Sequence, residues 1–191
     1  MSEPASRHPL QQRVAAAILD GAARIFALQG EQASMNDVAA AAGVARATVY
    51  RYFPNREALL DELTQAAVSD VDVRLASARI DEVAPEEGIA RVVRALVGLG
   101  DSFVLLAREQ PRSDPERLER VLTQPLRRLF ERGQADGEIR DDITSARLTD
   151  ALIGLLVGVL TSTPSLGVDD MTATITGLFL DGARARGPRR R

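Results

Sequence analysis

The chain contains 191 residues, 45% of them apolar, with a net charge of −3, 24 basic residues and no cysteine, and such a composition can build one or two globular domains. The absence of cysteine excludes disulfides, thiolate metal sites and cysteine nucleophiles. The longest apolar run, residues 151–160, is half the roughly 20 residues that a membrane-spanning helix needs, so we expect a cytoplasmic protein without membrane segments.

The first helix is marked by one apolar face. Val14, Ile18, Ile25 and Phe26 repeat at helical spacing, and Gly30 stands where a left-handed helix cap is expected. The sequence therefore predicts a helix that ends near Gly30.

Two short helices and a long one should follow. Ser34 and Asp37 form a capping-box-like start for a second helix, which we expect to end near Gly43. A third short helix is predicted over residues 45–52. The Pro-Asn pair at 54–55 then closes the third helix and offers a cap for a long fourth helix.

Prolines and glycines mark the predicted helix boundaries in the middle of the chain. Pro85, followed by two glutamates, predicts the start of a helix that should stop before Pro111. The Asp-Pro pair at 114–115 predicts another start. Pro125 should interrupt that helix, and the glycines of segment 133–137 should end it.

Two final helices are predicted over residues 144–162 and 169–185. No stretch of the sequence shows the apolar alternation of a β-strand bounded by turn residues. We therefore expect an all-α fold of about nine helices.

The second and third predicted helices have the spacing of a helix-turn-helix. Ala39, Gly43 and Val49 are four and then six residues apart, which suits two short helices that cross closely at a tight turn. Taken alone, this spacing fits a helical hairpin in a core equally well.

Side chains that can hold nucleic acid lie on or just past the third helix. Their guanidinium, hydroxyl and phenol groups can donate to phosphates and base edges, and the side chains are Arg46, Thr48, Tyr50, Arg51, Tyr52 and Arg56. Residues 1–56 carry six arginines and four acidic residues, whereas residues 64–183 carry 13 and 20. The alternative interpretation is a solvated basic face with half-buried tyrosines. Phe53 is expected to be a core residue.

The stretch GEQASMNDVAAAAGVARATVYRYFPNREALLDEL, residues 30–63, resembles the DNA-binding region of the TetR (tetracycline repressor-like) family of transcriptional regulators. The turn glycine, the Thr-Val-Tyr run, the Tyr-Phe-Pro-Asn segment and the basic residue that opens the next helix come in register. The resemblance covers about residues 10–63, with a weaker match in DGEIRDDI. It implies a helix-turn-helix domain over residues 1–54, a ligand-binding and dimerisation domain over 55–187 and an arginine-rich tail over 188–191.

The resemblance also implies specific DNA contacts, because in this family the third helix enters the major groove. The start of that helix would face base edges, its tyrosines would lie on the backbone, and the starts of the second and fourth helices would clamp flanking phosphates. The implied DNA-binding residues are Ser34, Arg46, Ala47, Thr48, Tyr50, Tyr52 and Arg56. Ala45, Ala47 and Arg56 replace residues more usual in the family, which affects base preference rather than DNA binding.

The family binds a small molecule among the helices of its second domain, under the fourth helix. The candidate lining residues are Leu63, Leu96, Leu99, Phe103, Leu106, Leu122, Leu126 and Phe130, each of which also suits a plain core. Few aromatic residues lie beyond residue 63, which argues against an aromatic cage and favours an aliphatic or lipophilic effector. The fourth helix would couple such a pocket to the DNA-binding region.

The last two helices are candidates for dimerisation. The run ALIGLLVGVL is too apolar for a surface helix, and Gly154 and Gly158 would let another helix approach closely. A central buried helix is the alternative, whereas the family pairs these helices in a four-helix bundle across a two-fold axis. The candidate interface residues are Leu152, Ile153, Leu156, Val157, Leu160, Ile175, Leu178 and Phe179.

The sequence gives no indication of catalysis. His8 is the only histidine, so histidine bases and His-metal clusters are excluded downstream, and we expect neither enzyme activity nor a cofactor or metal. We expect a homodimeric repressor that binds a palindromic double-stranded DNA operator and is released by a small apolar effector. The alternative is a helical lipid-binding or protein-interaction module without operator binding.

Overall fold

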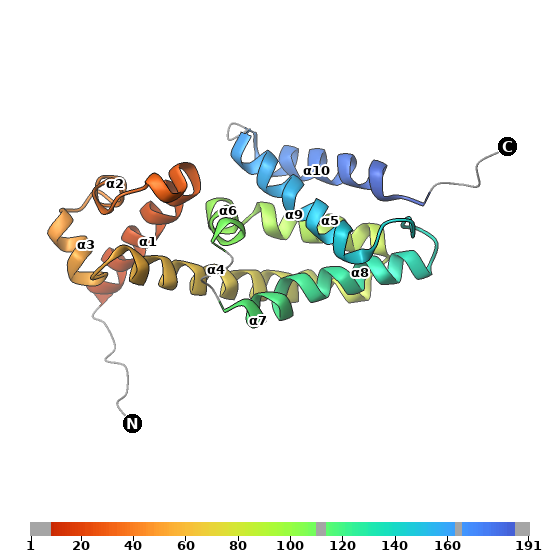
Figure 1. The fold of residues 1–191 in the computed structure, drawn as a ribbon, viewed down its shortest axis with the longest axis horizontal. Helices are drawn as coiled ribbons and strands as arrows, with labels where there is room; N and C mark the ends of the chain where they lie inside the picture. The colour runs from red at the N-terminus through yellow and green to blue at the C-terminus, as the bar shows by residue number, and fades with distance from the viewer. Residues whose placement is uncertain (1–8, 110–113, 163–165, 186–191) are drawn as a thin grey trace, which may run out of the picture. The chain divides into compact units, whose positions relative to one another are not determined.

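The computed structural model describes residues 9–109, 114–162 and 166–185 (Figure 1). His8 and the predicted arginine-rich tail at 188–191 lie outside the described residues. The chain divides into two compact units, the first ending at Leu63 and the second beginning at Thr64.

The first unit is built from four helical segments. It contains α1 (Pro9–Gln29), the 3-10 turn η1 (Gly30–Gln32), α2 (Met35–Ala41), α3 (Arg46–Tyr52) and the first turns of α4 (Arg56–Ala78). These helices lie where the sequence predicts them. Gly30 and Gly43 have φ angles of 58° and 65°, a region that glycine enters without steric cost, so the predicted cap and turn are confirmed.

Close packing of α1 against α2 depends on a glycine that the sequence pattern did not single out. A Cβ atom on Gly21 would lie 2.9 Å from the backbone nitrogen of Ala42, closer than side chains tolerate. The small core beneath this crossing is formed by apolar side chains that are at most 1% exposed, among them Ile18, Phe26, Val38, Val49, Phe53, Leu59 and Leu60. Gly21 therefore lets the helix-turn-helix segment sit directly on α1.

The second unit continues with α4 and adds the following elements: η2 (Ile80–Glu82), α5 (Pro85–Val97), α6 (Asp101–Arg108), α7 (Pro115–Leu118), the π-helical segment η3 (Glu119–Thr123), α8 (Gln124–Ala135), α9 (Ser145–Ser162) and α10 (Val168–Ala183). The predicted helix starts at Pro85 and Pro115 are confirmed. Asp114 caps α7, because its Oδ1 accepts a hydrogen bond of 3.0 Å from the backbone N–H of Arg117.

The single helix predicted from Pro85 to Pro111 was wrong. The chain turns after Val97, and Gly100 adopts a φ of 53° before α6 begins at Asp101. The physical reason is the glycine itself, since a positive φ ends a helix and costs glycine little. Sequence analysis missed this break because the apolar pattern continues on both sides of it.

Pro125 does not interrupt its helix as predicted. A π-helical segment over Glu119–Thr123 leads directly into α8, and Pro125 occupies the first turn of α8. A proline lacks the N–H that a regular α-helix would use there, and a π segment rearranges the hydrogen bonds locally without ending the helix. If the continuous α7–η3–α8 segment is counted as one, the described residues form nine helices.

The fold is all-α, as the sequence predicts. Within the described parts of the chain there is no strand, only an isolated bridge between Ile139 and Arg184. This bridge attaches the loop after α8 to the end of α10, because Arg140 N donates to Ala183 O at 2.9 Å and Ala185 N donates to Glu138 O at 2.8 Å.

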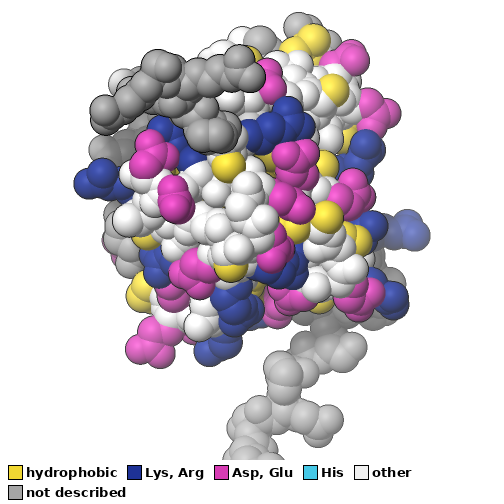
Figure 2. Space-filling model, turned by 90° about the vertical axis from the view of Figure 1, so that its right-hand side faces the viewer, with side chains coloured by type: hydrophobic (Ala, Val, Ile, Leu, Met, Phe, Trp, Pro, Cys, Tyr) yellow, Lys and Arg dark blue, Asp and Glu magenta, His cyan; other side chains and the backbone are white. Residues whose placement is uncertain are grey.

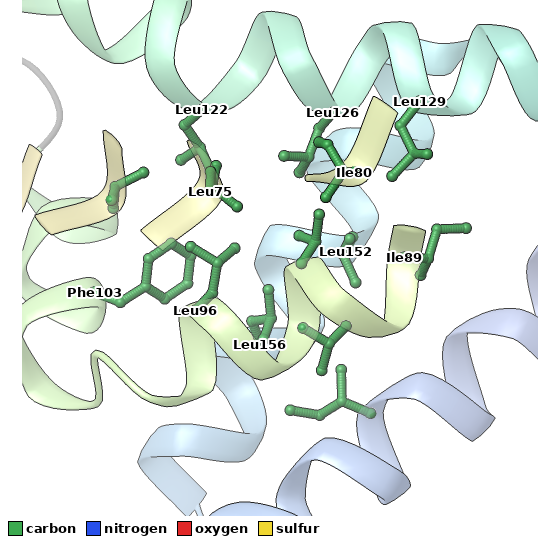
Figure 3. Packing of buried hydrophobic residues seen from close by; sticks show 14 of the residues in the cluster. Leu75, Ile80, Ile89, Leu96, Phe103, Leu122, Leu126, Leu129, Leu152 and Leu156 are labelled. Atoms are coloured by element: carbon green, nitrogen blue, oxygen red, sulfur yellow. The ribbon is translucent and has the colours of Figure 1, made fainter. Parts of the chain in front are cut away.

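The second unit has a core centred on α5. Ile89, Val92 and Leu96 of this helix are fully buried. Figure 3 shows side chains from neighbouring elements around Ile89 and Leu96, including Leu75, Leu122, Leu126, Leu152 and Leu156. Burying one such side chain stabilises a fold by about 1.5–3 kcal/mol. This core is therefore filled by the chain's own side chains.

By length and composition alone, α9 is apolar enough to cross a membrane. Residues Ser145–Ser162 have a mean hydropathy of 1.3, and 22% of them are buried. The sequence prediction considered only the shorter run 151–160 and did not anticipate this. Leu148, Leu152 and Leu156 of α9 are buried in the core of the second unit, as in the packed helix of a globular domain.

Candidate nucleic-acid interface

The start of α2 is fixed by a reciprocal cap between Ser34 and Asp37. The backbone N–H of Asp37 donates to Ser34 Oγ at 3.3 Å, and Ser34 N donates to Asp37 Oδ2 at 2.9 Å. The hydroxyl of Ser34 also lies 2.6 Å from Oδ2, and this hydrogen bond, followed by that of the Ser34 backbone, lowers the pKa of the Asp37 carboxyl. The predicted capping box is confirmed.

Two buried side chains hold α3 against the rest of the first unit. Val49 and Phe53 are 0% and 1% exposed, and the core position predicted for Phe53 is confirmed. Because these residues face inward, Arg46, Ala47 and Tyr50 lie on the exposed side of the helix. Thr48 and Tyr52 are half-buried beside them.

Arg46 and Tyr50 form a pair on this exposed side. Arg46 Nη2 lies 3.4 Å from Tyr50 Oη, and the guanidinium carbon lies 5.3 Å from the centre of the ring. Cation–π contacts of this kind orient an exposed arginine at a gain of about 0.5–1 kcal/mol. The two side chains therefore present a guanidinium and a phenol together.

Arg51 belongs to the same surface, although the set of DNA-binding residues implied by the sequence does not include it. It is exposed, and its guanidinium lies 5.5 Å from the centre of the Tyr52 ring. Its spacing of four residues from Ala47 places it on the exposed side of α3. The sequence places Arg51 among the donor side chains of this helix, and only the family resemblance assigns it no DNA contact.

Arg56 has contacts within the first unit that the sequence did not predict. Its Nη2 and Nε donate to the carbonyl oxygens of Gly30 and Ala33 at 3.2 and 3.4 Å, and its guanidinium stacks on Phe26. The side chain is half-buried. Arg56 thus joins the start of α4 to the turn before α2, where Ser34 lies.

The arrangement of α3 suits contact with a polyanion. Arg46 and Arg51 supply planar donors, Tyr50 supplies a hydroxyl, and Ala47 between them leaves room for close approach. Buried Val49 and Phe53 hold the helix itself, and the exposed side chains contact one another in the pairs Arg46–Tyr50 and Arg51–Tyr52. Among the described residues, no group of three or more His, Cys, Asp or Glu could hold a metal ion.

The candidate effector residues lie in the interior of their units. Leu63, Leu96, Phe103, Leu106, Leu122, Leu126 and Phe130 are at most 5% exposed, and Leu99 is half-buried. None of them lines the surface cavities described for the second unit, which lie beside Arg79, Arg108 and Arg74. An effector at these residues would have to separate packed side chains.

The candidate dimer residues divide between core and surface. Leu152, Leu156 and Ile175 are fully buried within the second unit, and Phe179 packs on Phe130 with ring centres 5.6 Å apart. Leu178 is 61% exposed. Half-buried positions of α9 lie between these extremes and comprise Ile153, Val157 and Leu160.

Three glycines within α9 and α10 face open space. A Cβ atom on Gly154, Gly158 or Gly177 would meet no atom within 4 Å in the described chain. A glycine within a helix costs about 1 kcal/mol relative to alanine. Packing within a single described chain therefore gives no reason for these glycines.

Comparisons with known proteins agree with this geometry. Residues 18–63 match the model of the tetR family of bacterial regulatory proteins. The transcriptional repressor LfrR of Mycolicibacterium smegmatis is 37% identical over 123 residues, which cover 61% of this chain and 61% of LfrR. The chain thus spans less than two thirds of that relative.

Solved structures share the fold over most of the chain. LfrR in complex with proflavine aligns with a TM-score of 0.69 at 22% identity and covers 91% of this chain and 97% of that chain. AibR in complex with isovaleryl coenzyme A and operator DNA aligns with a TM-score of 0.67 at 20% identity and covers 86% and 97%.

Proposed function

Because this chain belongs to the tetR family of bacterial regulatory proteins, we propose that it is a cytoplasmic, homodimeric transcriptional repressor that binds operator DNA and responds to a small molecule. The observation that carries the proposal is the exposed side of α3, where Arg46, Ala47 and Tyr50 stand over buried Val49 and Phe53. A helix held in this way can enter a major groove without rearranging.

Each exposed residue of α3 has a distinct chemical role in this proposal. Arg46 reads a base edge, since a guanidinium pairs bidentately with guanine, and Ala47 packs on a base at the same step. Tyr50 and Arg51 bind phosphates, which positions the helix without specifying sequence. Ser34, Thr48 and Tyr52 contribute backbone contacts at the rim.

Arg56 acts mainly through the fold in this proposal. Its bonds to the carbonyls of Gly30 and Ala33 position the turn that leads into Ser34. A guanidinium has five N–H donors, so one edge can still reach a flanking phosphate. Its expected role as a phosphate clamp is thus combined with a structural one.

Dimerisation is proposed through the exposed positions of α9 and α10, among them Gly154 and Gly158 of α9 and Gly177 and Leu178 of α10. Glycines permit the backbones of two helices to approach closely, and Leu178 supplies apolar area to bury. A two-fold dimer also matches two half-sites of a palindrome.

The effector is proposed to bind in the second unit and to change operator affinity. LfrR has been solved with proflavine and AibR with isovaleryl coenzyme A, so relatives of this fold accept small ligands. The largely apolar surroundings of Leu99, Phe103 and Leu126 favour a small apolar compound. Its binding is expected to release the repressor from DNA.

The test is selection of bound sequences from random duplex DNA with the purified chain. Enrichment of a pseudo-palindrome whose affinity falls steeply with salt supports the proposal. Recovery of random sequences, with equal affinity for any duplex, would contradict it and favour a helical lipid-binding or protein-interaction module instead.

A further inference from the structure

A shallow groove lies between the second half of α4 and α5, and three of its six lining residues are arginines. It has a volume of about 320 Å³ and is lined by Arg74, Ser77, Ala78, Arg91, Arg94 and Ala95. Arg74 and Ala78 share one side of α4, and Arg91 and Arg94 share one side of α5, so the guanidinium groups converge from two helices. The lining contains no carboxylate.

The groove has arginines but no carboxylate among its own lining residues. On the face drawn in Figure 2, arginines and carboxylates lie interspersed, and they neutralise one another. In the groove, alanines separate three guanidinium groups; Arg91 and Arg94 also contact Glu87 and Asp169 outside the lining, so three positive groups face two negative ones. The groove therefore favours binding of a negatively charged ligand and disfavours binding of a positively charged one.

Arg91 is held rigidly at the floor of the groove. Its Nε donates to Glu87 Oε1 at 2.9 Å, and its Nη1 donates to the carbonyl of Ala78 at 3.1 Å. The second bond ties α5 to the end of α4. Because these bonds use Nε and Nη1, Nη2 is left to face a ligand.

Arg94 is restrained only weakly. Its Nη1 lies 2.9 Å from Asp169 Oδ1, but the two side chains are 65% and 87% exposed. Exposed pairs of this kind contribute little because water screens them. A multiply charged anion in the groove can therefore compete for Arg94.

Arg74 is positioned by a glycine on the facing helix. A Cβ atom on Gly98 would lie 2.8 Å from Arg74 Nη1 and 3.3 Å from the carbonyl oxygen of Arg94. Gly98 has an ordinary helical φ of −65°, so its backbone does not require glycine. The guanidinium of Arg74 occupies the space beside Gly98 at the carboxyl end of α5, and a Cβ atom there would displace this flexible group.

Among the contacts of the described residues, none joins Arg74 to a carboxylate. The carboxyl end of a helix attracts a cation, which explains where the group rests in the absence of a ligand. Arg74, Arg91 and Arg94 thus form one cluster, with at least one donor edge of each able to serve an anion.

We propose that this groove binds a small molecule through a phosphate or diphosphate group. Guanidinium groups match the spacing of phosphate oxygens and form charge-assisted hydrogen bonds with them, and three of them compensate a multiply charged group. The groove is too shallow to enclose a large apolar body, so the charged group carries the recognition. This site is independent of the proposed contacts of α3 with DNA.

The experiment is a calorimetric titration of the full chain with inorganic pyrophosphate at constant ionic strength. We expect saturable binding that weakens by about tenfold in Arg74→Gln and in Arg94→Gln, since each loses one charge-assisted contact. The matched control is Arg79→Gln, which removes an arginine with a 69% exposed side chain outside this groove and should bind like the original chain.

A second variant tests the geometry and not only the charge. Gly98→Ala keeps every arginine but fills the space that Arg74 Nη1 occupies, so pyrophosphate affinity should fall while the helical circular dichroism stays unchanged. Absence of saturable binding in the original chain, or equal losses in Arg74→Gln and Arg79→Gln, would overturn the site.

A titration with duplex DNA distinguishes binding of a small phosphate ligand from binding of a nucleic-acid backbone. We expect Arg74→Gln to bind duplex DNA with the affinity of the original chain and to bind pyrophosphate more weakly. The opposite result, lost duplex affinity with pyrophosphate binding intact, would mean that the groove contacts nucleic acid, and the proposal would be wrong.

Discussion

The guanidinium of Arg56 lies over the ring of Phe26, 4.8 Å from the ring centre. The same side chain donates to the carbonyl oxygens of Gly30 and Ala33, 26 and 23 residues earlier in the chain. One arginine thus joins α1, the turn before α2 and the start of α4. Its position decides where Ser34 and the helix-turn-helix stand.

Arg56→Ala should therefore destabilise the first unit, by about 1–3 kcal/mol, since it removes a cation–π contact and two hydrogen bonds. Urea denaturation followed by circular dichroism measures this change. Arg51→Ala removes an exposed arginine of α3 and should change stability by less than about 0.5 kcal/mol. Equal stability of the two variants would show that the contacts of Arg56 are incidental.

Arg46→Ala should weaken operator binding by about 1–3 kcal/mol and relax sequence preference at one symmetric pair of positions, because a bidentate base contact is lost. Tyr50→Ala should weaken binding to all duplexes alike. Fluorescence anisotropy with a set of singly substituted operators distinguishes these patterns. Arg79→Ala, remote from α3 in the sequence, serves as the control with an equal change of charge.

The start of α2 and the turn after it could be predicted because they depend on neighbours in sequence. Ser34 caps with a residue three positions away, and Gly43 bends the chain at its own position. The role of Arg56 could not be predicted, since its partners at Phe26, Gly30 and Ala33 are brought to it only by the fold.

Which residues of the last two helices are buried could be predicted only in part. A helix as apolar as α9 has no clear polar side, so its periodicity does not distinguish Leu156, which is fully buried, from its half-buried neighbours. For α10, the sequence placed Leu178 and Phe179 in one set, although the first is 61% exposed and the second 7%. Packing within the second unit makes that distinction.

Ser34→Ala should raise the pKa of Asp37 toward its ordinary value of 3.8, because the Ser34 hydrogen bonds that favour the carboxylate are reduced. In the folded original chain the pKa is lowered, so this stabilisation is present above pH 3.8 and is lost as the pH falls through the folded value. Carboxyl NMR titration of both chains checks the shift.

Leu178→Glu should convert the dimer to a folded monomer, because a charge enters a surface that we propose to be buried between two copies. Gly158→Arg should act in the same way by preventing close approach. Sedimentation velocity with circular dichroism measures both properties. Leu28→Glu, at a leucine that is 67% exposed in the first unit, is the matched control and should remain dimeric. Leu156→Glu should instead unfold the second unit, since Leu156 is fully buried within it.

An effector found by thermal-shift screening of lipophilic compounds should bind more weakly when operator DNA is present. The interior residues Leu96, Leu126 and Phe130 are fully packed, so an apolar ligand must stabilise an arrangement in which some of them separate. If DNA favours the packed arrangement, ligand and operator oppose each other. Thermodynamic linkage then requires that each lower the affinity of the other by the same factor, about 5–150-fold for typical couplings of 1–3 kcal/mol. Calorimetric titration of the effector with and without operator measures this factor, and titration of the operator with and without effector must return the same value. Equal effector affinities in the two titrations would mean that the second unit only dimerises the protein.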